Sequence, residues 1–150
     1  MIETPGAVLF VCNYNAIRSP MAEGLLKSYL GHRVFVDSVG VLPTATPDPF
    51  MIAVMDELGI DMTRHRPKSF DDLEDATEAF DLVVTLSPAA QHRALELTRF
   101  ASMEVEYWVT FDPSTVEGSR DVRLDAYRGV RDLLRQRIVA RFPARPAPEV

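Results

Sequence analysis

Short apolar runs alternate with segments of helical periodicity along most of the chain. The apolar runs predict strands at residues 7–12, 34–38, 80–86 and 103–109. Apolar residues at helical spacing predict helices at residues 20–30, 49–58 and 88–97, and a long helix after residue 119. Strands that alternate with helices favour an α/β fold, here a single-domain, four-stranded parallel sheet with helices on both faces. In such a sheet a ligand binds beyond the carboxyl ends of the strands.

A serine or aspartate followed by proline marks the expected start of three helices. The pairs are Ser19-Pro20, Asp48-Pro49 and Ser87-Pro88. In each pair we expect a capping side chain and a proline at the first helical position. Ser119 is the expected cap of the last helix. Glutamates alternate with apolar residues over 103–109, which predicts an edge strand or a strand with one wetted face.

Length and charge narrow the classes of function. The chain has 150 residues, so we expect one domain over residues 1–142 and a disordered, Pro-rich tail at 143–150. The net charge of −6 argues against nucleic-acid binding, because a phosphate backbone requires a basic face. No apolar run approaches the length of a membrane span, and no export signal is visible. We therefore expect a cytoplasmic protein without a membrane partner.

The single cysteine, Cys12, lies at the carboxyl end of the first predicted strand. One cysteine excludes an internal disulfide and a cysteine-based zinc site. Arg18 follows six residues later, just before the first predicted helix, so the loop between them must curl tightly. Backbone N–H groups, the helix N-terminus and the Arg18 guanidinium can then hold a tetrahedral oxyanion. The same positive field favours the thiolate form of Cys12. The alternative is that Cys12 is a small buried hydrophobic residue.

The pattern Cys12-x5-Arg18-Ser19 between a strand and a helix resembles the low-molecular-weight protein-tyrosine phosphatases and the arsenate reductases that share their fold. The resemblance implies a phosphotyrosine phosphatase I-like fold, with Cys12 as the nucleophile and Arg18 as the phosphate clamp. It also implies that Ser19 donates a hydrogen bond to the thiolate. The implied phosphate-binding residues are Asn13, Tyr14, Asn15, Ala16, Ile17, Arg18 and Ser19. Asn15, Ser38 and, as a looser match, His65 correspond to a supporting polar set beneath the loop; the alternative for His65 is a solvated loop residue.

The resemblance further implies that Asp112, in the pair Asp112-Pro113, is the general acid and base. The alternative is an ordinary turn aspartate, because Asp-Pro favours turns. With Cys12 as the nucleophile and Asp112 as the proton donor, a phosphate ester would be hydrolysed through a cysteinyl-phosphate without a metal or an organic cofactor.

Four positions depart from the phosphatase pattern. Tyr14 stands where the phosphatases have glycine, and Ile17 stands where they usually have a second cysteine. Ser114 and Thr115 replace the aromatic pair that stacks on a phosphotyrosine ring. An aromatic wall would then have to come from Tyr14, Phe111 or Trp108.

The leading hypothesis is a phosphomonoesterase that acts on a phosphorylated protein or a small aryl phosphate. The runner-up is an arsenate reductase, because residues 48–61, 65–68 and 112–118 resemble that branch. An internal relay of three cysteines is excluded, so arsenate reduction would need an external thiol. A third possibility, from another class, is a non-catalytic module that binds phosphate or arsenate without turnover.

Overall fold

The computed structural model describes residues 5–73, 79–97 and 102–143. Its strands are β1 (Ala7–Cys12), β2 (Phe35–Gly40), β3 (Leu82–Thr85) and β4 (Glu104–Tyr107). Its helices are α1 (Arg18–Leu30), α2 (Pro49–Asp56), α3 (Pro88–Leu97) and α4 (Arg120–Arg141), with short 3-10 helices η1 (Gly31–Arg33) and η3 (Pro113–Thr115). The predicted strands and helices are confirmed in number and order within these residues. The expected tail at 143–150 lies, beyond Pro143, outside the described residues.

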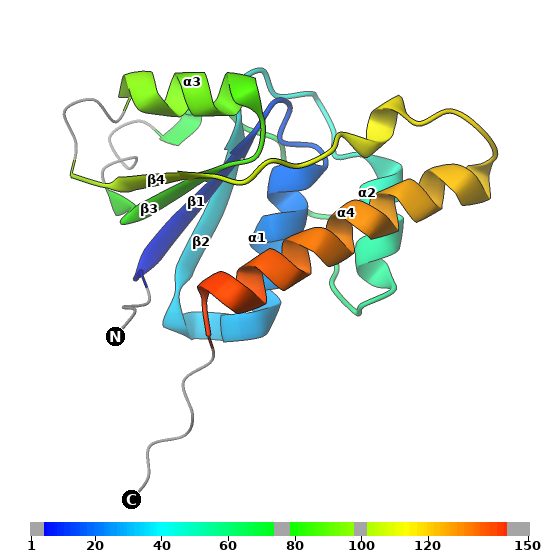
Figure 1. Cartoon of the computed structure of the whole chain (residues 1–150), viewed down its shortest axis with the longest axis horizontal. Coiled ribbons are helices and arrows are strands. Elements are labelled where there is room, and N and C mark those ends of the chain that lie inside the picture. The colour runs from blue at the N-terminus through cyan, green and yellow to red at the C-terminus, as the bar shows by residue number, and fades with distance from the viewer. Residues whose placement is uncertain (1–4, 74–78, 98–101, 144–150) are drawn as a thin grey trace, which may run out of the picture.

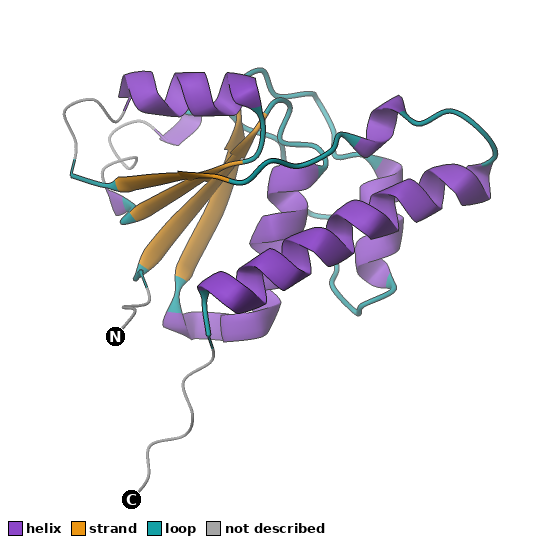
Figure 2. Cartoon of the chain, in the orientation of Figure 1, coloured by secondary structure: helices purple, strands orange, loops and turns teal. Residues whose placement is uncertain are grey.

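The four strands form one parallel sheet in the order β2-β1-β3-β4 (Figure 2). β1 is central and pairs with β2 on one side and with β3 on the other. β4 lies at an edge, which confirms the position expected from its glutamates. Because parallel strands end at the same edge of a sheet, the residues after β1, β2 and β4 converge there.

Alternate residues of β1 face two separate hydrophobic clusters. Val8, Phe10 and Cys12 belong to the larger cluster, which is built with α1, α2 and α4. Leu9 and Val11 belong to the smaller cluster, which includes residues of α3. Figure 1 shows α3 on one side of the sheet and the other three helices on the opposite side. Every residue of β1 is buried, as expected for a central parallel strand covered on both faces.

Three of the four predicted helix caps are confirmed. Asp48 Oδ1 accepts hydrogen bonds from the amides at the start of α2, with Phe50 N at 2.8 Å. Ser87 Oγ accepts from Ala90 N at 3.2 Å. Ser119 Oγ accepts from Val122 N at 3.2 Å.

The prediction that Ser19 caps α1 is wrong. The helix begins at Arg18, its N-cap residue is Ile17, and no side chain caps it. Ser19 therefore lies inside the first turn, where its hydroxyl is fully buried. The hydroxyl instead contacts Cys12 Sγ at 2.9 Å, so a tertiary partner replaces the local one.

An ion cluster joins the end of α2 to the middle of α4. Glu57 accepts hydrogen bonds from Arg128 Nη2 at 2.7 Å and from Arg131 Nη1 at 2.8 Å. Arg131 is 8% exposed and also donates to Val54 O at 2.7 Å. The hydrogen bonds from Arg128, and then those from Arg131, lower the pKa of Glu57 to about 2.

We expect the substitution Glu57→Gln to lower the free energy of unfolding at neutral pH by about 1 kcal/mol. The Glu57 side chain is 38% exposed, so solvent screens the pairs and keeps the effect near that of surface ion pairs. Because folding lowers the pKa from 4.5, the stabilisation is complete above 4.5 and is lost as pH falls towards 2. Urea unfolding of both proteins across this range measures the difference, with exposed Glu117→Gln as the control. The prediction would be contradicted if the free energies of unfolding of the wild type and Glu57→Gln still differed at pH near 2 as much as they do at neutral pH.

Within the residues that the structure describes, no helix has both the length and the hydrophobicity needed to cross a bilayer.

Candidate active site

The segment between β1 and α1 forms a loop whose carbonyl groups all have partners outside it. The carbonyls of Cys12, Asn13 and Tyr14 accept from the amides of Val41 at 3.0 Å, Leu42 at 2.8 Å and Thr44 at 3.2 Å. The carbonyl of Asn15 accepts from His65 Nε2 at 2.8 Å, that of Ala16 from Asp48 N at 3.1 Å and that of Ile17 from Met21 N at 3.0 Å.

This arrangement fixes the direction of the amide groups. No peptide bond in the described residues is cis, and in a trans peptide the N–H points opposite to the preceding carbonyl. Because the carbonyls of residues 12–17 point outward, the N–H groups of residues 13–18 point to the inner side of the loop. Such a ring of amides, placed at the N-terminus of α1, attracts an anion. These six residues lie within the phosphate-binding set that the sequence predicts.

Two backbone positions allow the loop to close. Asn15 has a positive φ of 54°, a left-handed conformation that asparagine tolerates better than most residues. Gly40, at the end of β2, lies against the loop. A Cβ on Gly40 would lie 2.7 Å from Asn15 N and 2.7 Å from the carbonyl carbon of Tyr14. Glycine is therefore required at this close approach.

The sulfur of Cys12 faces hydrogen-bond donors from the start of α1. Ser19 N lies 3.4 Å from Cys12 Sγ, and Ser19 Oγ lies 2.9 Å from it. Cys12 is 3% exposed and contributes to the larger core cluster. Burial alone would fit a small hydrophobic residue, but these polar contacts to the sulfur are not expected of one.

A chain of hydrogen bonds orients the Ser19 hydroxyl. Asn15 Nδ2 donates to Ser19 Oγ at 2.8 Å and to Ser38 Oγ at 2.9 Å. Ser38 in turn donates to Glu23 Oε1 at 2.5 Å. Because the amide nitrogen of Asn15 only donates, Ser19 accepts from it and keeps its own proton for a further partner. Its contact with Cys12 Sγ, at 2.9 Å, is shorter than that with Val39 O, at 3.4 Å.

The sequence analysis missed Glu23, which ends this chain of hydrogen bonds. Its exposed fraction is 9%, and it also pairs with Lys27 at 2.5 Å. Glu23 lies four residues after Ser19, so the two side chains share one face of α1. This four-residue spacing is the feature of the sequence from which a role for Glu23 near Ser19 could have been predicted.

His65 reaches the loop from the segment after α2. Its Nε2 lies 2.8 Å from Asn15 O, and because a carbonyl only accepts, Nε2 carries the proton. Burial lowers the pKa of His65 below its usual value, although the bond to Asn15 O and the charge of Glu23 oppose this effect. The Oδ1 of Asn15 also accepts from Lys68 N at 2.9 Å. The side-chain nitrogen, the side-chain oxygen and the backbone carbonyl of Asn15 are therefore all hydrogen-bonded.

The guanidinium of Arg18 is 6% exposed and is anchored at one nitrogen. Nη1 donates to Leu86 O and to Thr110 O, each at 3.2 Å. Among the described residues, Nε and Nη2 have no acceptor, so they remain available for two oxygens of an anion. Sequence reasoning did not identify Thr110, because this contact joins residues 92 positions apart.

Asp112 follows Thr110 by two residues and caps η3. Its Oδ1 accepts from Ser114 Oγ at 2.7 Å and from Ser114 N at 3.0 Å. Within the described residues no donor is paired with Oδ2, so one carboxyl oxygen remains available. Burial, and then the hydrogen bond that the Tyr127 hydroxyl donates to Asp48 Oδ2 at 2.9 Å, raise the pKa of Tyr127. The negative charge of Asp112 adds a smaller effect in the same direction.

The aromatic side chains proposed for the wall of the site differ in exposure. Tyr14 is 46% exposed and Phe111 is 54% exposed, so both can meet a ligand. Trp108 is only 5% exposed and packs against Phe10 with ring centroids 5.9 Å apart. The expectation that Trp108 could supply a wall is therefore wrong, because the indole fills the core.

Histidine, cysteine and carboxylate side chains do not gather into a metal-binding group anywhere in the described ranges.

Comparison with known proteins gives a consistent assignment. The family described as low molecular weight phosphotyrosine protein phosphatase matches residues 7–141. An arsenate reductase from Halalkalibacterium halodurans is 32% identical over 131 residues, which cover 87% of this chain and 91% of that protein. The solved structure of the Erwinia amylovora tyrosine phosphatase AmsI has a TM-score of 0.76 at 20% identity, covering 94% of this chain and 95% of that one. The Escherichia coli tyrosine phosphatase Wzb, solved with sulphate, has a TM-score of 0.74 at 22% identity, covering 91% and 96%. Because the family match spans most of the chain, this protein belongs to the low-molecular-weight phosphotyrosine protein phosphatase family.

Proposed function

We propose that this protein is a phosphomonoesterase that hydrolyses aryl phosphates, including phosphotyrosine, through a cysteinyl-phosphate on Cys12. The observation that carries the proposal is the loop itself. Its outward carbonyls direct six amides inward above a sulfur that Ser19 contacts at 2.9 Å. Arg18, at the end of the same loop, keeps two guanidinium nitrogens without an acceptor among the described residues. This arrangement suits a tetrahedral dianion and a thiolate nucleophile.

In the first step, the Cys12 thiolate attacks phosphorus and forms the sulfur–phosphorus bond. The bond from phosphorus to the ester oxygen breaks, and the Asp112 carboxylic acid gives its proton to the departing oxygen. The electron pair of the broken bond leaves with that oxygen, so the released product is a neutral phenol. The available Oδ2 of Asp112 is the atom suited to this transfer.

In the second step, water attacks the cysteinyl-phosphate. The Asp112 carboxylate accepts a proton from this water, and the sulfur–phosphorus bond breaks to restore the Cys12 thiolate and release phosphate. The Ser19 hydroxyl stabilises the departing sulfur, and Arg18 with the loop amides stabilises the equatorial oxygens. Electrons and protons balance without a redox partner.

The preference for an aromatic leaving group rests on Tyr14 and Phe111. Tyr14 belongs to the loop, and Phe111 directly precedes Asp112. Their exposed rings provide apolar surface for the ring of a phenolic ester, in place of the aromatic pair that Ser114 and Thr115 replace.

Arsenate reduction is the second candidate, because the Halalkalibacterium halodurans relative is an arsenate reductase. Arsenate has the shape of phosphate, so the same loop suits it. Cys12 would form a thiolate adduct with arsenate, and attack of an external thiol on the Cys12 sulfur would release arsenite and leave a mixed disulfide at Cys12. A second external thiol would then restore Cys12, so two thiols are oxidised to one disulfide for each arsenate reduced. The external thiol is required since Cys12 is the only cysteine of the 150 residues.

One assay separates the candidates. We expect p-nitrophenyl phosphate to be hydrolysed without added thiol, with one phosphate released for each phenol. Arsenate supplied with glutathione should yield no arsenite. Thiol-dependent arsenite production without ester hydrolysis would replace the proposal by the second candidate. Phosphate binding without either turnover would indicate a non-catalytic module.

A further inference from the structure

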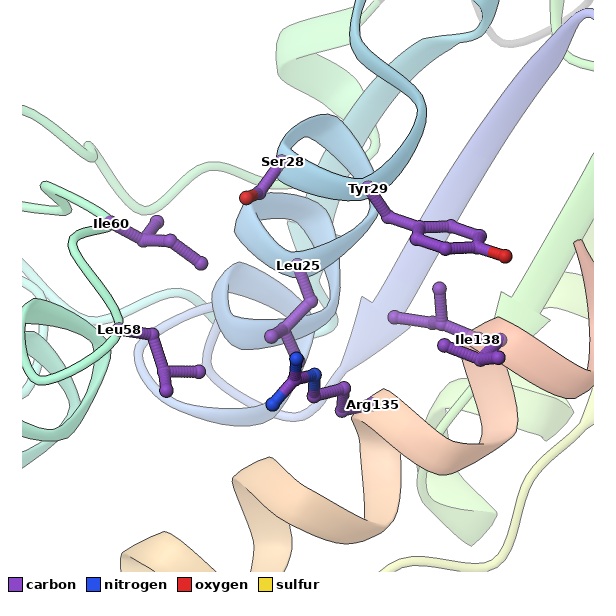
Figure 3. A pocket seen from close by; sticks show the side chains of 8 residues that line it. Leu25, Ser28, Tyr29, Leu58, Ile60, Arg135 and Ile138 are labelled. Carbon is purple, nitrogen blue, oxygen red and sulfur yellow. The ribbon is translucent and has the colours of Figure 1, made fainter. Parts of the chain in front are cut away.

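A cleft separate from the Cys12 loop lies where the C-terminal half of α1, the segment after α2 and the last turns of α4 meet (Figure 3). Its volume is about 330 Å³, at the lower end of the range of small-molecule sites. None of its lining residues belongs to the loop or to the hydrogen-bond network beneath it. The proposed hydrolysis therefore makes no use of this cleft.

The cleft is lined mainly by aliphatic side chains. Leu25 and Ile138 are 5% and 1% exposed and belong to the core, so they form its floor. Leu58 is 37% exposed and Val139 is 45% exposed, which places them at the accessible walls. Ile60 packs against the core and also lines the cleft. Exposed aliphatic groups beside a hollow favour an apolar ligand over water.

Among the described residues, Arg135 is the only charged one that lines the cleft. Figure 3 shows its side chain extending towards Leu25 and Leu58. Three other arginines of α4 are held by carboxylates within 3 Å, namely Arg128, Arg131 and Arg141. Arg135 has no acidic partner within the described ranges, so its guanidinium is free to bind an anion.

We propose that this cleft binds a small amphipathic carboxylate, with one acid group on an unbranched aliphatic chain. The carboxylate pairs with Arg135, and the chain lies along Leu25, Leu58 and Ile138. Arg135 lines the apolar cleft and has no acidic partner among the described residues, so its positive charge attracts an anion to this place. The apolar floor favours a ligand with an aliphatic chain over a hydrated anion such as phosphate, because phosphate has no apolar surface to bury there.

Calorimetric titration of the full chain with decanoate, below the concentration at which it forms micelles, tests the proposal. We expect one site, and we expect Arg135→Gln to weaken binding by about tenfold or more. The matched control is Arg137→Gln, which removes an exposed arginine of the same helix that does not line the cleft. Decanol, the neutral analogue, should bind the wild type as weakly as decanoate binds Arg135→Gln.

Amide chemical shifts locate the ligand and separate this proposal from the proposed hydrolysis. Decanoate should move the amides of Leu25, Leu58 and Ile138, and the variant Cys12→Ser should bind it with unchanged affinity. Shifts confined to the Cys12 loop, or equal weakening by the two arginine variants, would overturn the inference. So would an absence of binding by the wild type, whatever the result of the hydrolysis assay.

Discussion

The substitution Cys12→Ser should lower turnover of an aryl phosphate by about 10³-fold or more while phosphate still binds. A serine hydroxyl is a much weaker nucleophile than the thiolate and forms no cysteinyl-phosphate. The loop amides and Arg18 do not depend on the sulfur, because the loop carbonyls are held by residues 41–48, His65 and Met21. Steady-state hydrolysis of p-nitrophenyl phosphate measures the loss.

Phosphate binding by the same variant is the control. An increase in thermal stability with phosphate, equal in the two proteins, would show that the loop is intact. Mass spectrometry of wild type quenched during turnover should detect one added phosphoryl group on the peptide that contains Cys12. Unchanged turnover in Cys12→Ser would rule out Cys12 as the nucleophile.

The substitution Asp112→Ala should lower kcat by about 10²–10⁴-fold for an ester with a poor leaving group. Phenyl phosphate needs a proton on the departing oxygen far more than p-nitrophenyl phosphate does, because phenoxide is the stronger base. The loss should therefore be larger for phenyl phosphate. Measuring kcat for both substrates across the acidic range gives the comparison.

Two variants serve as controls for the role of Asp112. Asp121→Ala removes an exposed carboxylate in the first turn of α4 and should leave kcat unchanged. Ser114→Ala removes the hydroxyl that donates to Asp112 Oδ1 at 2.7 Å and should change kcat much less than Asp112→Ala. An equal loss for both leaving groups in Asp112→Ala would contradict proton transfer by this residue.

The restraint on Asn15 explains why the loop can hold its shape before a ligand arrives. Ser19, Ser38 and Lys68 are all hydrogen-bonded to its side chain, and His65 contacts its carbonyl. Amides that are already aligned need no reorganisation when negative charge develops on a transferring phosphoryl group. The strained φ of Asn15 is therefore stabilised by partners from three separate segments: α1, β2 and the segment after α2.

Local pattern was enough for most of the fold. The continuous apolar run predicted a strand at β1, because a strand buried on both faces has no polar positions. The helical spacing of apolar residues predicted α4, because a helix buried along one stripe repeats its apolar residues every three to four positions. Capping by Asp48, Ser87 and Ser119 was also predictable, since a cap bonds to an amide only a few residues away. Ser19 has the same sequence signal, yet its hydroxyl is buried against Cys12.

The amino-acid pattern alone predicted the parallel sheet, the edge position of β4, and the placement of Cys12 and Arg18 at the two ends of one short loop. The folded chain was needed to show that Glu23 ends the network from Ser38, that Thr110 anchors Arg18, and that Trp108 fills the core. It also revealed the cleft beside Arg135. The physical reason is range: periodicity and caps act within a few residues, whereas these contacts depend on how distant segments pack.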